Sequence, residues 1–258
     1  MRATFILLIY TREILGECPI GRLALTHLEL SESYPSPPLY ESEDNSESLR
    51  SDWIETEDSW YYYLAEIVLR RIADKIVNAL FAVNDSCDFY RSSYPIEFLV
   101  PMTVEFERQI ASWHESLPDS MSFPTSPIAV DSELRYFLRS RYYLVSELLH
   151  RPFLCYAVHN PELATPEVLE CAQKCILFAV NYLMHSNHAH RHHGKWLQLR
   201  REVTAACLLL AASSTNIGLP QGWDIGVERA LAHLQYWSME LPVLDSWKQI
   251  VRTVKDSF

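Results

Sequence analysis

The sequence predicts an all-α fold, an irregular bundle of about seven helices. Apolar residues recur at spacings of three and four over most of the 258-residue chain, which is the period of an amphipathic helix. Glycine is scarce, with 6 in the whole chain, and the periodic stretches contain almost none. No segment shows the alternation of apolar and polar residues that is typical of a strand.

The amino-terminal part is expected to form a helical segment over residues 1–30, followed by an acidic, Ser/Pro-rich linker over residues 31–52. The first apolar run is like that of a short signal peptide, but Arg12 and Glu13 follow it at once and no A-x-A-like cleavage site is present. We therefore expect residues 3–17 to form a helix of the core. The linker shows no periodicity and predicts a loop.

Residues 53–258 are expected to form one helical domain, whose first three helices are marked by apolar stripes. The stripe residues are Ala65, Leu69, Ile72, Ile76 and Leu80, then Leu99, Met102, Phe106, Ile110 and Trp113, then Leu134, Leu138, Val145 and Leu148. Asp131 is the predicted cap of the third helix. Pro152 is predicted to kink or interrupt that helix, because proline lacks the backbone donor.

Four more helices complete the prediction. Thr165-Pro166-Glu167 is a start signal that combines a capping hydroxyl, a proline at the first helical position and an early carboxylate. The next helix, over 195–213, becomes apolar all round from 205 to 212, which predicts a central buried helix. The last two stripes are Val227, Leu231, Leu234 and Leu241, then Leu244, Trp247, Val251 and Val254.

Charge and hydropathy exclude two classes of partner. The formal net charge is -11 and the isoelectric point is about 5.4, so the chain repels phosphate backbones and no direct nucleic-acid contact is expected. The basic pairs Arg70-Arg71 and Arg200-Arg201 lie inside helical runs and predict solvated faces. No apolar run reaches the roughly 18 residues that span a bilayer, so no membrane insertion is expected.

The 6 cysteines are spread along the chain without a CxxC pair, which favours free thiols and a reducing compartment. Cys171 and Cys175 are one helical turn apart, and we expect them to pack on the flank of a helix rather than to hold a metal.

A run of histidines is the strongest metal-site candidate. Imidazoles suit zinc or nickel, but no acidic residue or cysteine lies in the segment to complete a ligand set, so we expect a polar connector between two helices and predict no metal site and no cofactor. Whether the run binds metal stays open. Its members are His185, His188, His190, His192 and His193.

No catalytic residues are predicted, and we expect the chain not to be an enzyme. The motifs GxSxG, HExxH and GxGxxG and the phosphate loop are absent, and no acidic residue sits in a context that suggests a raised pKa. An alternative is a helical small-molecule binding protein or enzyme, whose pocket would be lined by aromatic residues. The candidates are Trp60, Tyr61, Tyr62, Tyr63, Tyr142 and Tyr143.

Four segments carry a resemblance to a known family. They are SWYYYLAEIVLRRIADKI (59–76), EFERQIASWHESLP (105–118), DSELRYFLRSRYYLVSELLHRPFLCYAVHNP (131–161) and RHHGKWLQLRREVTAACLLLAA (191–212). Their order and spacing resemble the carboxy-terminal part of the fungal-specific transcription factor domain. That domain is the helical regulatory region of fungal zinc binuclear cluster activators.

The resemblance implies a nuclear protein of transcriptional control whose large helical domain tunes an activator. It implies protein partners of transcriptional control or a small-molecule effector. The family's DNA reader is a six-cysteine zinc cluster, and its CxxC pairs are missing here. We therefore expect a truncated or shortened regulatory domain with exposed apolar surface and the option of self-association.

Overall fold

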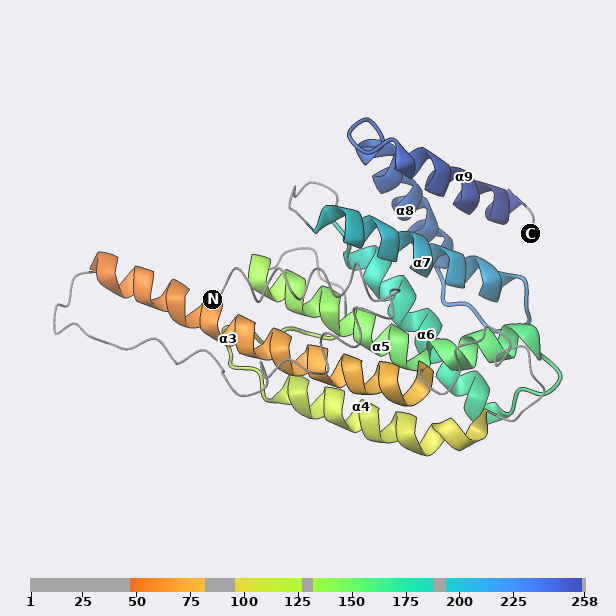
Figure 1. Cartoon of the computed structure of the whole chain (residues 1–258), viewed down its shortest axis with the longest axis horizontal. Helices are drawn as coiled ribbons and strands as arrows, with labels where there is room; N and C mark the ends of the chain where they lie inside the picture. The colour runs from red at the N-terminus through yellow and green to blue at the C-terminus, as the bar shows by residue number, and fades with distance from the viewer. Residues whose placement is uncertain (1–46, 82–95, 127–131, 188–193, 257–258) are drawn as a thin grey trace.

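The computed structural model describes residues 47–81, 96–126, 132–187 and 194–256. Within these ranges the chain forms seven α-helices, α3 to α9, and no strand. The prediction of an all-α fold is confirmed. In Figure 1 α3 and α4 lie on one side of the molecule, α8 and α9 on the other, and α5, α6 and α7 between them. The helix expected over residues 3–17 lies outside the described residues.

Helix α3 (Glu47–Ile76) begins inside the stretch that was predicted as a linker, residues 31–52. The segment 47–52 contains no glycine or proline, the two residues least favourable inside a helix. Beyond Ile76 the chain continues in a π-helical turn, Val77–Phe81. The predicted stripe from Ala65 to Leu80 is buried.

Helix α4 (Val100–Glu115) follows a short 3₁₀ turn, Glu97–Leu99, and lies beside α3. Its predicted stripe points into the core, since Phe106, Ile110 and Trp113 are buried. The indole nitrogen of Trp113 donates to the carbonyl oxygen of Ala65 at 3.0 Å, which ties α4 to α3.

Helix α5 (Glu133–His159) differs from the sequence prediction at its N-cap and continues through its proline. Ser132, rather than Asp131, caps it, because its hydroxyl accepts from the backbone nitrogen of Arg135 at 3.4 Å; Asp131 lies outside the described residues. Pro152 does not interrupt the helix, although Figure 1 shows its axis bending part-way along. The turns beyond the proline stay helical because their apolar side chains are buried in the core: Phe153, Leu154, Tyr156 and Ala157.

Helix α6 (Pro166–His185) packs along α5 in the most extensive contact of the described residues. It starts at the predicted Thr165-Pro166 pair, but the Thr165 hydroxyl makes no capping bond. Helix α7 (Lys195–Ser213) has the predicted bounds. It is not buried all round, because Cys207 and Leu208 are only half-buried.

Helices α8 (Trp223–Trp237) and α9 (Val243–Asp256) end the described chain. Gly222 precedes α8 with a φ of 81°, a left-handed conformation that glycine adopts without strain. A small separate core joins α7, α8 and α9 through Leu199, Leu234 and Leu244. Leu241 lies in the turn between α8 and α9 and not in the predicted helix.

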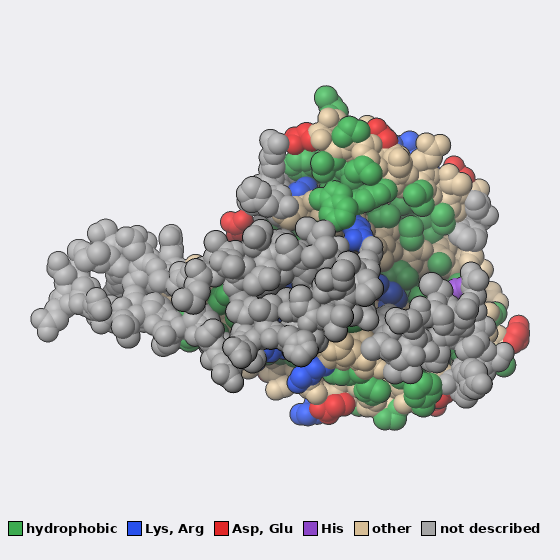
Figure 2. Space-filling model, in the orientation of Figure 1, with side chains coloured by type: hydrophobic (Ala, Val, Ile, Leu, Met, Phe, Trp, Pro, Cys, Tyr) green, Lys and Arg blue, Asp and Glu red, His purple; other side chains and the backbone are tan. Residues whose placement is uncertain are grey.

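The surface carries apolar side chains among the charged ones (Figure 2). The C-terminal helices and the turn between them expose several, with Met239 92% and Tyr236 59% accessible. The sequence led us to expect such surface; association with a second copy stays a prediction. None of the described helices combines the length and the apolar character needed to cross a bilayer.

Candidate functional site

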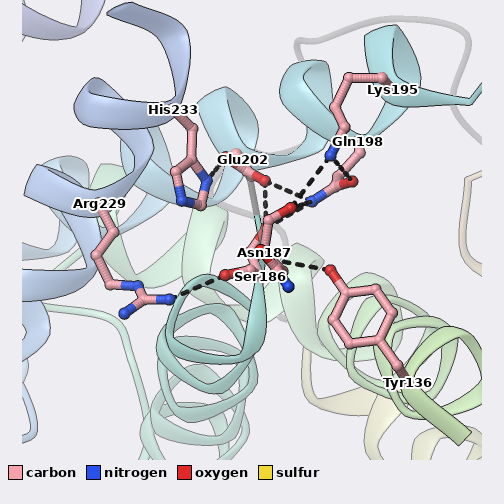
Figure 3. A network of polar contacts seen from close by, with 8 residues as sticks. All are labelled: Tyr136, Ser186, Asn187, Lys195, Gln198, Glu202, Arg229 and His233. Atoms are coloured by element: carbon pink, nitrogen blue, oxygen red, sulfur yellow. Dashed lines mark hydrogen bonds and ion pairs between the residues drawn. The ribbon is translucent and has the colours of Figure 1, made fainter. Parts of the chain in front are cut away.

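A network of buried polar groups joins the end of α6 to α5, α7 and α8 (Figure 3). Ser186 and Asn187 belong to it and follow the last residue of α6. Helix α7 contributes Lys195, Gln198 and Glu202, whose spacing of three and four residues places them on one face of the helix. Helical periodicity therefore delivers three polar side chains to one point at the end of α6.

Glu202 is the centre of this network. Its side chain is 0% exposed, and a carboxylate in such a place needs hydrogen-bond donors. His233 Nδ1 on α8 donates to one carboxylate oxygen at 2.8 Å. Gln198 Nε2 donates to the other at 3.0 Å, and the Ser186 hydroxyl donates to that same oxygen. One carboxylate thus connects three elements.

Backbone groups after α6 extend the network. Arg229 on α8 donates from Nη2 to the carbonyl oxygen of Ser186 at 2.9 Å. The Asn187 nitrogen donates to the hydroxyl of Tyr136 on α5 at 3.0 Å, and Lys195 Nζ donates to the Asn187 carbonyl oxygen at 3.1 Å. The chain leaving α6 is therefore held by side chains from three other helices.

Lys195 is an ammonium group in an unusually buried position, 5% exposed. Burial lowers its pKa, and the charge of Glu202 opposes that effect. Nζ also donates to Gln198 Oε1 at 3.0 Å and lies 5.4 Å from the centre of the Trp237 ring. Cation–π contact and hydrogen bonds offset part of the cost of its desolvation.

Serine, histidine and carboxylate are the residue types of a hydrolytic triad, but their order here differs from one. In a triad the imidazole lies between the serine and the carboxylate and accepts the serine proton. Ser186 instead donates directly to Glu202, and His233 contacts the same carboxylate through Nδ1. The described geometry gives Ser186 no imidazole base, and the hydrogen bonds of the network connect the helices.

A pocket with a volume of about 130 Å³ lies beside the network and shares Tyr136 and Gln198 with it. Its walls come from α3, α5, α6 and the start of α7. The lining residues are Tyr62, Glu66, Tyr136, Phe137, Ser140, Arg141, Tyr182, Gly194, Leu197, Gln198 and Arg201.

The pocket wall contains charged groups of both signs. Two arginines, Arg141 and Arg201, line it together with one carboxylate, Glu66. Glu66 is 8% exposed and is held by Arg141 Nε at 3.1 Å and by Arg70 Nε at 2.6 Å. The two guanidinium groups are therefore the groups of the wall that can recognise an anion.

Tyr136 and Tyr182 stay protonated over the ordinary pH range. Burial raises the pKa of Tyr136, and the charge of Glu202 adds to this effect. Burial and then the charge of Glu202 raise the pKa of Tyr182, against the smaller opposing effect of Arg201 and Arg141. These hydroxyls are therefore neutral groups that can donate to an oxygen acceptor.

The predicted aromatic pocket is only partly the observed one. Tyr62 lines the pocket, but Tyr142 and Tyr143 pack elsewhere in the core. Tyr143 is 0% exposed and donates from its hydroxyl to the carbonyl oxygen of Thr125 at 2.8 Å. Tyr142 lies against the rings of Phe123 and Phe178. The residues that sequence reasoning did not select for the pocket are Tyr136, Phe137 and Tyr182.

Glu202 and His233 were missed as well, although the sequence held a signal for both. Glu202 follows Leu199 by three residues and precedes Ala206 by four, and both neighbours are buried. His233 lies three residues after Ala230 on the buried face of α8. A polar residue at a stripe position predicts a buried group that needs partners, and this signal would have identified both residues.

The basic pair Arg200-Arg201 was expected on a solvated face and is instead divided between two environments. Arg201 lines the pocket. The Arg200 guanidinium lies 5.7 Å from the centre of the Trp196 ring. Adjacent residues on a helix point about 100° apart, which separates the two side chains.

The histidine run lies mostly outside the described residues: His188, His190, His192 and His193. Its first member, His185, is not in a connector but is the buried last residue of α6. Its Nε2 donates to the Tyr136 carbonyl oxygen at 3.0 Å, and burial lowers its pKa to about 4. Among the described residues no group of three or more His, Cys, Asp or Glu could hold a metal ion.

Cys171 and Cys175 pack against the core as the sequence predicted. Both are free and buried. Burial raises the pKa of Cys171 to about 11 and the pKa of Cys175 well above its usual value. Neutral, buried thiols of this kind are poor nucleophiles and poor metal ligands.

A second buried polar cluster ties α4 to α5 and α6. His150 is 1% exposed, and its Nδ1 and Nε2 face the Ser146 carbonyl oxygen at 2.7 Å and Glu107 at 2.8 Å. Lys174 on α6 donates to the same Glu107 oxygen at 2.9 Å. The hydrogen bond from His150, followed by that from Lys174, lowers the Glu107 pKa to about 2. The cluster is a second cross-link between helices.

Comparison with family models, with curated proteins and with solved structures gives no match to this chain.

Proposed function

We propose that this chain is the helical regulatory part of a fungal transcription factor, acting in the nucleus and responding to a small-molecule effector or a protein partner. The resemblance of segments 59–76, 105–118, 131–161 and 191–212 to the regulatory domain supports the link to transcription. The net charge of -11 supports a role without direct DNA contact, since it repels phosphates.

One residue carries the regulatory part of the proposal. Gln198 lines the pocket, and the same side chain bonds to Glu202 and Ser186 in the buried network. A molecule that contacts Gln198 in the pocket competes with those bonds or strengthens them. A ligand shifts a conformational equilibrium only if it contacts one conformation better than the other. Here the hydrogen bonds of Gln198 connect the pocket to α7 and to the end of α6, and Glu202 continues the connection to α8.

A reporter assay tests the proposal. The full chain is fused to a heterologous DNA-binding domain, and we expect its reporter output to differ from that of the DNA-binding domain alone. Gln198→Ala should change the output because it removes the shared side chain. The matched control is Gln173→Ala on the exposed face of α6, which should leave it unchanged. Equal output from fusion and DNA-binding domain in every condition tested would contradict the proposal.

A helical small-molecule binding protein outside transcription is the second candidate, and the pocket beside α7 is the observation that favours it. An enzyme is the less supported form of this candidate. General acid–base catalysis needs paired proton-transfer groups, and the lining residues include one carboxylate, Glu66, and no histidine. Ligand binding by the chain without any reporter effect would favour this candidate over the first.

A further inference from the structure

The pocket beside α7 presents two arginines in a chain of net charge -11. Arg141 and Arg201 line it, and Glu66 is ion-paired with Arg141 and with Arg70. Guanidinium groups recognise carboxylates and phosphates through paired, charge-assisted hydrogen bonds. The two guanidinium groups therefore suit an anionic group of a ligand.

The volume suits a small anion. The pocket measures about 130 Å³, and an apolar cavity of about 150 Å³ holds a single benzene molecule. One six-membered ring with a small charged substituent therefore fits this space. A larger ligand would extend from the pocket into solvent.

The remaining lining residues favour a planar ring over a bare inorganic anion. Tyr62, Tyr136, Phe137 and Tyr182 line the pocket from three helices. Aromatic rings gain from offset or edge contacts with a second ring beyond the burial of apolar area. Inorganic phosphate would satisfy the arginines but leave these ring faces uncovered.

We propose that the pocket binds a monocyclic aromatic carboxylate, whose carboxylate contacts Arg201 and whose ring packs against Phe137 and Tyr62. The pocket tyrosine hydroxyls supply neutral donors for the second carboxylate oxygen. The proposal names the effector class of the regulatory domain. The role of the ligand as an effector rests on the proposed function. The binding of the ligand to the pocket does not depend on a role in transcription.

Calorimetry on the full chain tests the ligand class with three probes: benzoate, benzyl alcohol and inorganic phosphate. Benzoate should bind, and the other two should bind at least about tenfold more weakly, because one lacks the charge and the other the ring. Absence of benzoate binding at millimolar concentration would overturn the proposal. So would equal affinity for benzyl alcohol or for phosphate.

Neighbouring arginines provide a matched pair of variants. Arg201→Gln should weaken benzoate binding about tenfold to a hundredfold, because it removes a charge-assisted hydrogen bond. Arg200→Gln removes the same charge beside Trp196, outside the pocket lining, and should leave binding unchanged. Equal losses of benzoate affinity in both variants would show that the overall surface charge attracts the ligand, and this result would overturn the assignment of the pocket. Circular dichroism establishes that each variant is folded.

A pocket-filling variant keeps the test decisive if Arg201→Gln fails to fold. Ser140 lines the pocket, and Ser140→Leu places an isobutyl group in it while both arginines remain. Benzoate binding should be lost; retained binding would overturn the site. If benzoate binds but the reporter output does not respond, the ligand assignment stands and the regulatory role is rejected. If the reporter responds but benzoate does not bind, the regulatory role stands and the ligand assignment is rejected.

Discussion

Glu202 and Arg201 are adjacent residues of α7 with different tasks. Glu202 is fully buried and accepts hydrogen bonds from groups on α7, α8 and the end of α6. Arg201 lines the pocket on the neighbouring side of the helix. Gln198 lies between the two environments and contacts both. Within two turns of α7, these three side chains therefore belong to a pocket with charged walls and to the buried hydrogen-bond network beside it.

His185 makes the stability of the fold depend on pH. Burial lowers its folded pKa to about 4 from 6.5, so the unfolded chain takes up a proton first as the pH falls. Its contribution to stability is therefore complete above pH 6.5 and is lost between 6.5 and about 4. A shift of this size corresponds to about 3 kcal/mol over the whole window.

The substitution His185→Gln should make the free energy of unfolding fall less steeply over that pH range, since glutamine can still donate to the Tyr136 carbonyl but does not titrate. Urea unfolding at several pH values measures it. His159→Gln is the control, because His159 is exposed and bonds only locally, to the Cys155 carbonyl oxygen at 2.8 Å. Parallel pH profiles for wild type and His185→Gln would contradict the assignment of a buried neutral ring.

At the scale of the helix, two N-caps of similar sequence differ in what they contribute. Ser132 accepts a hydrogen bond from the Arg135 nitrogen, whereas the Thr165 hydroxyl oxygen is buried and makes no hydrogen bond. We expect Ser132→Ala to lower the free energy of unfolding by about 0.5–1 kcal/mol, as loss of a cap does. Thr165→Val should be neutral or stabilising, because it removes a buried hydroxyl that lacks a partner.

Urea midpoints of the two variants, at equal slope, measure this difference. A loss of stability in Thr165→Val as large as that in Ser132→Ala would mean that the Thr165 hydroxyl caps α6 in solution. Both variants are compared with the same wild-type protein, so no value for the strength of a cap in another protein is needed.

Helix positions were predictable where local signals and packing agree. Helix α7 has the bounds that its pattern predicted, and α6 starts at the Thr165-Pro166 signal. Pro152 shows the limit of local signals. Its missing donor predicts a kink or an interruption; the axis of α5 bends, but the buried residues after the proline keep the helix continuous. The gain from burying Phe153 and Leu154 cannot be read from the proline itself, because it depends on what packs against them.

The pocket belongs to the whole molecule and was not predictable in the same way. Its aromatic residues come from α3, α5 and α6, and only the packing of these helices brings Tyr62, Tyr136 and Tyr182 together. Each is an ordinary residue of an amphipathic helix in the sequence. The pattern predicted that aromatic residues would be buried, but not which would line a space and which, like Tyr143, would fill the core.

Four helices surround or adjoin the pocket, but α8 contributes none of its lining residues. It is connected to the pocket helices by His233 to Glu202, by Arg229 to Ser186 and by its apolar packing on α6 and α7. A response of α8 to a molecule in the pocket therefore reports on transmission through these contacts and not on direct contact with the ligand. This is the central claim of the proposed regulatory mechanism.

Hydrogen–deuterium exchange of the full chain with and without benzoate tests that claim. We expect benzoate to change the exchange rates of backbone amides in α8 (Trp223–Trp237) as well as in the pocket helices, and expect neither change in Arg201→Gln. The two regions should respond together because Gln198 contacts both the pocket and Glu202. A response confined to the pocket helices α3, α5, α6 and α7, or no response at all, would contradict the coupling of pocket and network.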